Sequence, residues 1–112
     1  MSILDDPNIA KNAFGDIAPA LARYTDDVLF QDLWKRPDLK PRERSLITCA
    51  TLIALGRANE LRPHLGIAQA NGLSKEELIE MITHLCFYAG WPAGMTALGV
   101  AREVLYGGKA EA

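Results

Sequence analysis

The sequence predicts an all-α protein, a compact bundle of about five to six helices. Three observations support this. Apolar residues recur at spacings of three and four, no stretch alternates between apolar and polar residues as a strand would, and Pro and Gly fall at the expected helix ends. Nearly half of the 112 residues are apolar (49%), enough for one packed core. We therefore expect a single domain over residues 1–112, with an N-terminal arm at residues 1–7.

The first third of the chain predicts short helices. Residues 8–24 are expected to form two helical pieces or one kinked helix, because Gly15 and Pro19 interrupt the apolar pattern. A further helix is expected to be capped by Thr25 and to run to Trp34. Its first turn would hold two aspartates, where negative charge suits the exposed amides.

Two longer helices follow. Pro41 suits the first position of a helix that ends near Leu55, where Gly56 closes it. The broad apolar stripe of this helix predicts that it is central and buried on most sides. Asn59 is expected to cap the next helix, which covers residues 60–70.

The last two helices have the clearest boundaries. Ser74 and Glu77 form a capping box, in which each side chain satisfies a backbone amide of the other residue. This helix is expected to end at Gly90. Pro92 can open the final helix, which Gly107 terminates.

Charge and composition argue against several classes of partner. The net charge is −2, and the 12 basic residues are spread among 14 acidic ones, so we expect no nucleic-acid binding. No apolar run approaches the roughly 20 residues of a membrane span, and no signal-peptide pattern is present. Cys49 and Cys86 lie in apolar helical patterns, which predicts reduced, buried thiols. These features indicate a cytoplasmic protein without membrane contact.

Glu60 and His64 are the first candidates for chemistry. They stand at positions i and i+4 of one predicted helix, so both project from the same face. A carboxylate placed there can orient an imidazole and raise its pKa for general acid–base catalysis. The alternative is an exposed ion pair of little energetic value. Pro63 lies between them and makes this turn irregular.

The second histidine and its neighbour admit two interpretations. His84 lies beside an apolar stripe, so it is either a hydrogen-bonded core or interface residue, or part of a site. Cys86 sits in mid-helix without a CxxC partner, which favours packing over a role as nucleophile. A metal site built from both histidines and Glu60 has no supporting local motif, so we expect no metal.

Three arginines near these residues could bind an anion. Arg44 and Arg57 flank the central helix at its two ends, and Arg62 lies between Glu60 and His64. A guanidinium group can hold a carboxylate through two parallel hydrogen bonds. The alternative for each of them is a solvated basic side chain.

Several segments resemble the carboxymuconolactone decarboxylase family. They are RERSLIT at 42–48, ALGR at 54–57, ELRPHL at 60–65 and THLCFYAGWP at 83–92. The resemblance covers roughly residues 25–106. It implies the all-helical fold of the alkyl hydroperoxide reductase D-like proteins, and a homo-oligomer, a hexamer built as a ring of dimers or trimers, with sites near subunit interfaces.

The resemblance also implies a reaction without a cofactor, the decarboxylation of a carboxylated lactone or a similar cyclic acid. His64 would be the proton donor, oriented by Glu60. Arg57, Arg44 or Arg62 would hold the carboxylates or the oxyanion, and His84 and Trp91 would line the substrate pocket.

Related thiol proteins carry a CxxC pair on the helix that bears His64. Aligned on that histidine, the two cysteine positions here are Arg57 and Glu60, so the redox pair is absent. Pro63 and Cys86 also depart from the decarboxylase pattern. Two other functions therefore stay open: a catalytically silent, oligomeric helical module that binds a small molecule or a partner, and a thiol redox protein that uses Cys86.

Overall fold

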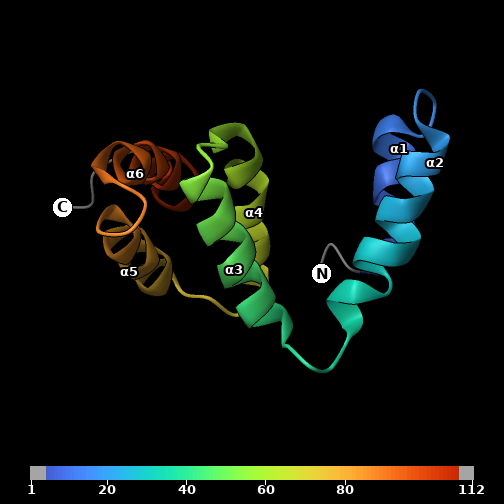
Figure 1. Ribbon diagram of the computed structural model, residues 1–112, viewed down its shortest axis with the longest axis horizontal. Helices are drawn as coiled ribbons and strands as arrows, with labels where there is room; N and C mark the ends of the chain where they lie inside the picture. Colours follow the sequence, from blue (N-terminus) through green and yellow to red (C-terminus); the bar gives the residue numbers. More distant parts are fainter. Residues whose placement is uncertain (1–4, 109–112) are drawn as a thin grey trace. The chain divides into compact units, whose positions relative to one another are not determined.

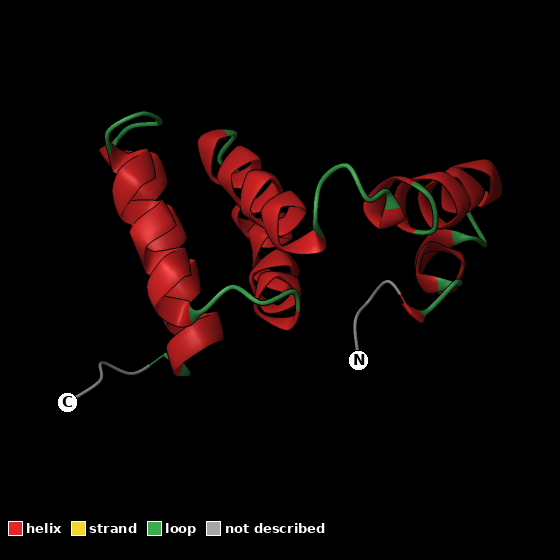
Figure 2. Ribbon diagram, turned by 90° about the horizontal axis from the view of Figure 1, so that it is seen from below, coloured by secondary structure: helices red, strands yellow, loops and turns green. Residues whose placement is uncertain are grey.

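The computed structural model describes residues 5–108, which are helical and contain no strand (Figure 2). The predicted all-α fold is therefore confirmed. Within this range, no helix combines the length and apolar character needed to cross a bilayer. The six α-helices, labelled in Figure 1, are α1 (Ile9–Phe14), α2 (Pro19–Arg23), α3 (Pro41–Ala54), α4 (Ala58–Ala70), α5 (Lys75–Cys86) and α6 (Trp91–Tyr106).

The chain divides into two compact units, Met1–Pro41 and Arg42–Ala112, and each is described by itself. The single domain expected from the sequence stays a prediction. Of the arm predicted at residues 1–7, residues 1–4 lie outside the described part of the chain.

The first unit contains the two short helices predicted before Tyr24, but not the capped helix predicted after it. The chain runs from α2 directly into a π-helix, η2 (Tyr24–Phe30). Thr25 caps nothing, because its hydroxyl donates to the Leu21 carbonyl one turn back (2.7 Å). The expected continuation to Trp34 is also wrong, since a separate 3₁₀ turn, η3 (Leu33–Lys35), contains this residue.

Asp26 has a different role from the one predicted for it. It is buried, and its two carboxylate oxygens accept hydrogen bonds from the backbone amides of Ala10 (2.8 Å) and Lys11 (2.9 Å). These amides belong to the first turn of α1, which has no side-chain cap of its own. Asp26 thus satisfies two free backbone amides at the start of another helix, α1.

The second unit is built around α6, which packs against both α4 and α5 (Figure 1). The helix α3 contributes Cys49 and Ile53 to this core. The expectation that α3 is buried on most sides is wrong. It buries one narrow stripe, while Ile47 and Leu55 are exposed. Buried apolar residues of the other three helices complete the core: Leu61, Leu65 and Ala68 of α4, Leu78, Met81 and Ile82 of α5, and Ala97, Val100, Ala101 and Leu105 of α6.

The predicted capping box at the start of α5 is confirmed. The Ser74 hydroxyl accepts from the Glu77 amide, and the Glu77 carboxylate accepts from the Ser74 amide, both at 3.0 Å. The end predicted for this helix is wrong, because α5 stops at Cys86 rather than at Gly90. Gly90 instead has a φ of 102° and precedes α6. Gly107, with a φ of 66°, terminates α6 as predicted.

Helices α5 and α6 approach closely at Gly94. A Cβ atom placed there would overlap the Cys86 sulfur, and it would lie 3.4 Å from the Cys86 Cβ. Cys86 and Cys49 are both free thiols, as predicted. The predicted burial is confirmed for Cys49 and wrong for Cys86, which is half-buried. The lack of a side chain at Gly94 therefore makes room for the Cys86 thiol.

Candidate functional site

The helix α4 begins at Ala58, two residues before the predicted start at Glu60. Arg57 is the residue before the helix, with φ −96° and ψ 67°, and its carbonyl accepts from the Leu61 amide (3.0 Å). The predicted cap at Asn59 is wrong, because Asn59 already lies inside the first turn. No side chain caps this turn, so its amides face outward from the helix end and favour negative charge.

Arg57 and Glu60 meet at this helix start. The Arg57 guanidinium donates from Nε (3.0 Å) and Nη2 (2.5 Å) to Oε1 of Glu60. They border an open hollow of about 250 Å³ that is lined by residues 56–60. An exposed pair of this kind adds at most about 1 kcal/mol to stability. The arrangement places a fixed cation and a carboxylate beside a helix N-terminus.

His64 lies one turn further along α4 and is half-buried. Its Nδ1 atom is buried and has no hydrogen-bond partner among the described residues. Burial lowers the pKa of the imidazole, whereas an engaged Glu60 carboxylate would raise it. The structure therefore gives His64 a neutral ring at neutral pH, with a nitrogen available to a water or a ligand.

The turn that carries His64 is held from a neighbouring helix. Pro63 lies inside α4, which continues through it without a break. From α3, the Cys49 thiol donates a hydrogen bond to the backbone carbonyl of His64 (3.6 Å). Burial raises the pKa of this thiol to about 11.

The other two predicted arginines have separate surroundings. Arg62 is exposed, and its guanidinium forms an ion pair with Glu103 of α6. Arg44 is half-buried on α3, where its carbonyl accepts from the Thr48 hydroxyl (2.8 Å). The ion pair directs the Arg62 guanidinium toward Glu103, so this cation is already matched by a carboxylate.

His84 belongs to a different hollow, a groove of about 590 Å³ between α3 and α5. Its ring stacks on Tyr88, with 4.8 Å between the ring centroids. The groove floor is apolar and its rim is charged: the lining comprises Leu46, Ile47, Ala50, Leu73, Met81 and Leu85, with Arg42, Glu77, Glu80 and His84. The predicted site residues are thus divided between this groove and the start of α4.

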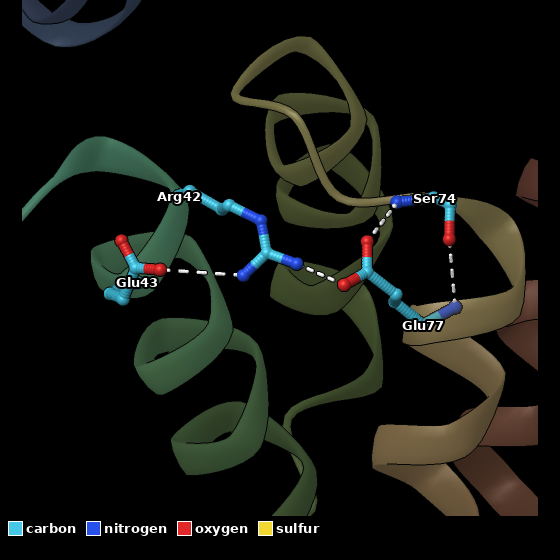
Figure 3. Close-up of polar contacts among 4 residues, drawn as sticks. All are labelled: Arg42, Glu43, Ser74 and Glu77. Atoms are coloured by element: carbon cyan, nitrogen blue, oxygen red, sulfur yellow. Dashed lines mark hydrogen bonds and ion pairs between the residues drawn. The ribbon is translucent and has the colours of Figure 1, made fainter.

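The groove rim contains a charged network that the sequence analysis did not identify (Figure 3). Arg42 donates to Glu43 (3.3 Å) and also forms an ion pair with Glu77, which in turn caps α5. The hydrogen bond from the Ser74 amide is the main cause that holds the pKa of the Glu77 carboxyl below its usual value, and Arg42 lowers it further. The capping box was the available signal, because it fixed the Glu77 side chain near the start of α5.

Trp91 belongs to an apolar surface at the junction of α5 and α6. Its ring meets Phe87 edge to face, with centroids 5.3 Å apart. Phe87 is 74% exposed, Tyr88 79%, Trp91 56% and Met95 53%. These four residues are called the aromatic face below.

The described residues contain no group of three or more His, Cys, Asp or Glu side chains placed to hold a metal ion.

Comparison with known proteins gives the family of the chain. Residues 19–103 match the carboxymuconolactone decarboxylase family. A 4-carboxymuconolactone decarboxylase of Acinetobacter baylyi is 49% identical over 73 residues, which are 65% of this chain and 54% of the relative. A nitrosuccinic acid decarboxylase of Metarhizium robertsii is 32% identical over 73 residues, 65% of this chain and 51% of the relative. The chain spans about half the length of these curated relatives. The match over most of its length shows that the chain belongs to the carboxymuconolactone decarboxylase family.

Proposed function

We propose that the protein is a decarboxylase that needs no cofactor and acts on a carboxylated lactone or a similar cyclic acid. The observation that carries this proposal is the half-buried His64, one turn beyond the Arg57–Glu60 pair, whose buried Nδ1 has no partner in the described part of the chain. Both similar proteins named above are decarboxylases, which supports the reaction class.

In the proposed reaction, the bond between the ring carbon and the departing carboxylate breaks, and CO₂ leaves. The electron pair of that bond passes into the unsaturated lactone as an enolate, which a cationic or hydrogen-bonding group must stabilise. His64 then delivers a proton to the ring carbon and regains one from water. Because the lowered pKa leaves the ring neutral at neutral pH, the ring must first take up a proton from water, and the imidazolium so formed is then a stronger acid than an ordinary one.

Arg57 would bind the carboxylate or the enolate oxygen at the start of α4, where the free amides of the first turn add positive potential. Glu60 fixes the guanidinium by accepting from Nε and Nη2. This differs from the role inferred from sequence, in which Glu60 orients His64. Glu60 would then act through Arg57.

The remaining predicted residues have places in the same proposal. Arg44 would hold a further carboxylate, and His84 and Trp91 would line the pocket, once subunits come together in a homo-oligomer. Arg62 would have to exchange its partner Glu103 for a substrate carboxylate. The hexamer implied by the family resemblance would supply that arrangement, with the sites near subunit interfaces.

The test is CO₂ release from a panel of carboxylated lactones by the wild-type protein, His64→Gln, Glu60→Gln and Arg57→Gln. We expect His64→Gln to lower kcat by roughly 10²–10⁴-fold, the usual contribution of a general acid. Arg57→Gln should raise KM, and Glu60→Gln should act in the same direction. Glu76→Gln, on the exposed first turn of α5, is the matched control. Unchanged turnover in His64→Gln would show that the proton-transfer role is wrong.

One observation favours a second candidate, a catalytically silent module that binds a small molecule. The α3–α5 groove, at about 590 Å³, has the size and apolar floor of a small-molecule site. A protein that turns over none of the lactones but binds one of them, with the affinity lost in Met81→Glu at the groove floor, would favour this candidate.

A further inference from the structure

We propose that Cys49 is a positioning residue for His64: from α3, it holds the turn of α4 that carries the imidazole. The inference rests on the proposed function insofar as His64 is the proton donor. The contact itself joins residues of two helices in the same compact unit.

The need for such a contact comes from Pro63. Proline has no backbone N–H, so the Asn59 carbonyl, four residues earlier, lacks its usual partner within the helix. The proline ring also crowds that carbonyl. The turn just before His64 is therefore held less firmly by the helix than its neighbours are.

Cys49 supplies a bond from outside the helix. Its side chain has no exposed surface, and its sulfur lies 3.6 Å from the His64 carbonyl oxygen. Because the pKa of this thiol is raised to about 11, the thiol stays protonated, and remains a donor, at every pH at which an imidazole titrates. The flanking core residues Leu61 and Leu65 are fully buried, so α4 is packed against the core on both sides of the histidine.

The contact from Cys49 therefore fixes how far the His64 ring is buried. Burial is the cause of its lowered pKa, and no charged group contributes to that shift. The Glu60 carboxylate on the same helix is held by Arg57. If the turn at residue 64 loosens, water reaches the ring and its pKa moves up toward the ordinary value for histidine.

The experiment is an NMR titration of the imidazole in the full chain, for the wild type, Cys49→Ala, Cys49→Val and Cys49→Ser. The chain has two histidines, so His64→Gln identifies the signal. We expect a higher His64 pKa in Cys49→Ala and Cys49→Val, and a value nearer the wild type in Cys49→Ser, which keeps a donor. Ile53→Val, one turn along the same buried stripe, is the control that trims the core without touching this contact.

An unchanged His64 pKa in both Cys49→Ala and Cys49→Val would overturn the proposal. So would wild-type behaviour of Cys49→Val alone, because it would show that the volume of the side chain matters rather than its hydrogen bond. Lactone turnover measured on the same samples separates the two proposals. If the Cys49 variants shift the His64 pKa but the wild-type protein releases no CO₂ from any lactone, the proposed function is wrong and the positioning role stands. If the wild-type protein is active but the Cys49 variants leave the His64 pKa unchanged, the positioning role is wrong and the proposed function stands.

Discussion

His64 combines a half-buried ring with a ring nitrogen that no group within residues 5–108 satisfies. Buried polar atoms in folded proteins are nearly always hydrogen-bonded, so such an atom calls for a water or a ligand. Glu60, the partner expected from the sequence, is engaged by Arg57 on its other side. Burial of the ring is what lowers the pKa of His64.

The lowered pKa of His64 predicts a pH-dependent stability. The folded protein holds this group at a pKa below that of the unfolded chain, about 6.5. Between the folded and the unfolded pKa, the unfolded chain binds more protons than the folded protein does. The contribution of His64 to the free energy of unfolding is therefore complete at a pH above the unfolded pKa, and it is lost as the pH falls through the folded pKa. Urea unfolding at about pH 7.5 and about pH 5 should show a larger loss for the wild type than for His64→Gln. Equal losses in both proteins would contradict the prediction.

For the candidate site, the sequence predicted the positions of Glu60 and His64 on one helix better than it predicted the side chains that contact them. The i, i+4 spacing placed Glu60 and His64 on one face, and that placement depends only on helical periodicity. The spacing does not predict the hydrogen bonds from Arg57 to Glu60, because a cap at Asn59 leaves Arg57 outside the helix. With Arg57 at the cap position, the pair becomes an i, i+3 contact across the first turn. The thiol contact from Cys49 joins two helices, so no local pattern announces it.

At the scale of elements, the boundaries set by local chemistry were predictable. The Ser74 capping box and the glycine that ends α6 involve neighbours in sequence, and both are confirmed. The π-helix η2 was not, because nothing near Thr25 marks a change of hydrogen-bond register. Asp26 binds amides 15 and 16 residues away, so its role depends on tertiary structure.

The close approach of α5 and α6 predicts that Gly94→Ala destabilises the protein. The added methyl group would overlap the Cys86 sulfur, and overpacking of this kind usually costs about 1–3 kcal/mol. Cys86→Ala removes the sulfur and leaves a contact of 3.4 Å to Cβ, so the double variant should recover much of the loss. Denaturant unfolding of the two single variants and the double variant measures this coupling.

Gly99→Ala is the matched control, since it lies in the same helix with open space at the Cβ position. It should be neutral or stabilise the protein, because alanine favours the helix. Additive effects of Gly94→Ala and Cys86→Ala would show that the sulfur is not the obstacle.

At the scale of the whole molecule, the family match spans residues of both compact units, whereas the candidate site lies in the second. The second unit also carries the aromatic face, four exposed apolar side chains at the junction of α5 and α6. Exposed apolar surface grouped in this way is typical of interfaces, where aromatic residues are enriched. We therefore propose the aromatic face as a contact between subunits of the expected homo-oligomer.

This proposal predicts that Trp91→Glu lowers the assembled mass. A buried, unpaired carboxylate at the centre of an interface is costly, so the oligomer should dissociate into smaller species. Size-exclusion chromatography with light scattering measures the mass. Glu76→Lys, at the opposite end of α5, should leave it unchanged. A Trp91→Glu protein of wild-type mass would place the interface elsewhere.

The carboxylate of Asp26 couples the first turn of α1 to η2. Because the amides of Ala10 and Lys11 have their partner on η2, α1 cannot fray from its start without also releasing that segment. The exchange of these two amide protons with solvent therefore reports on the contact between α1 and η2, rather than on the end of a six-residue helix alone. Two slowly exchanging protons would thus provide an internal gauge of whether residues far apart in the sequence remain folded together.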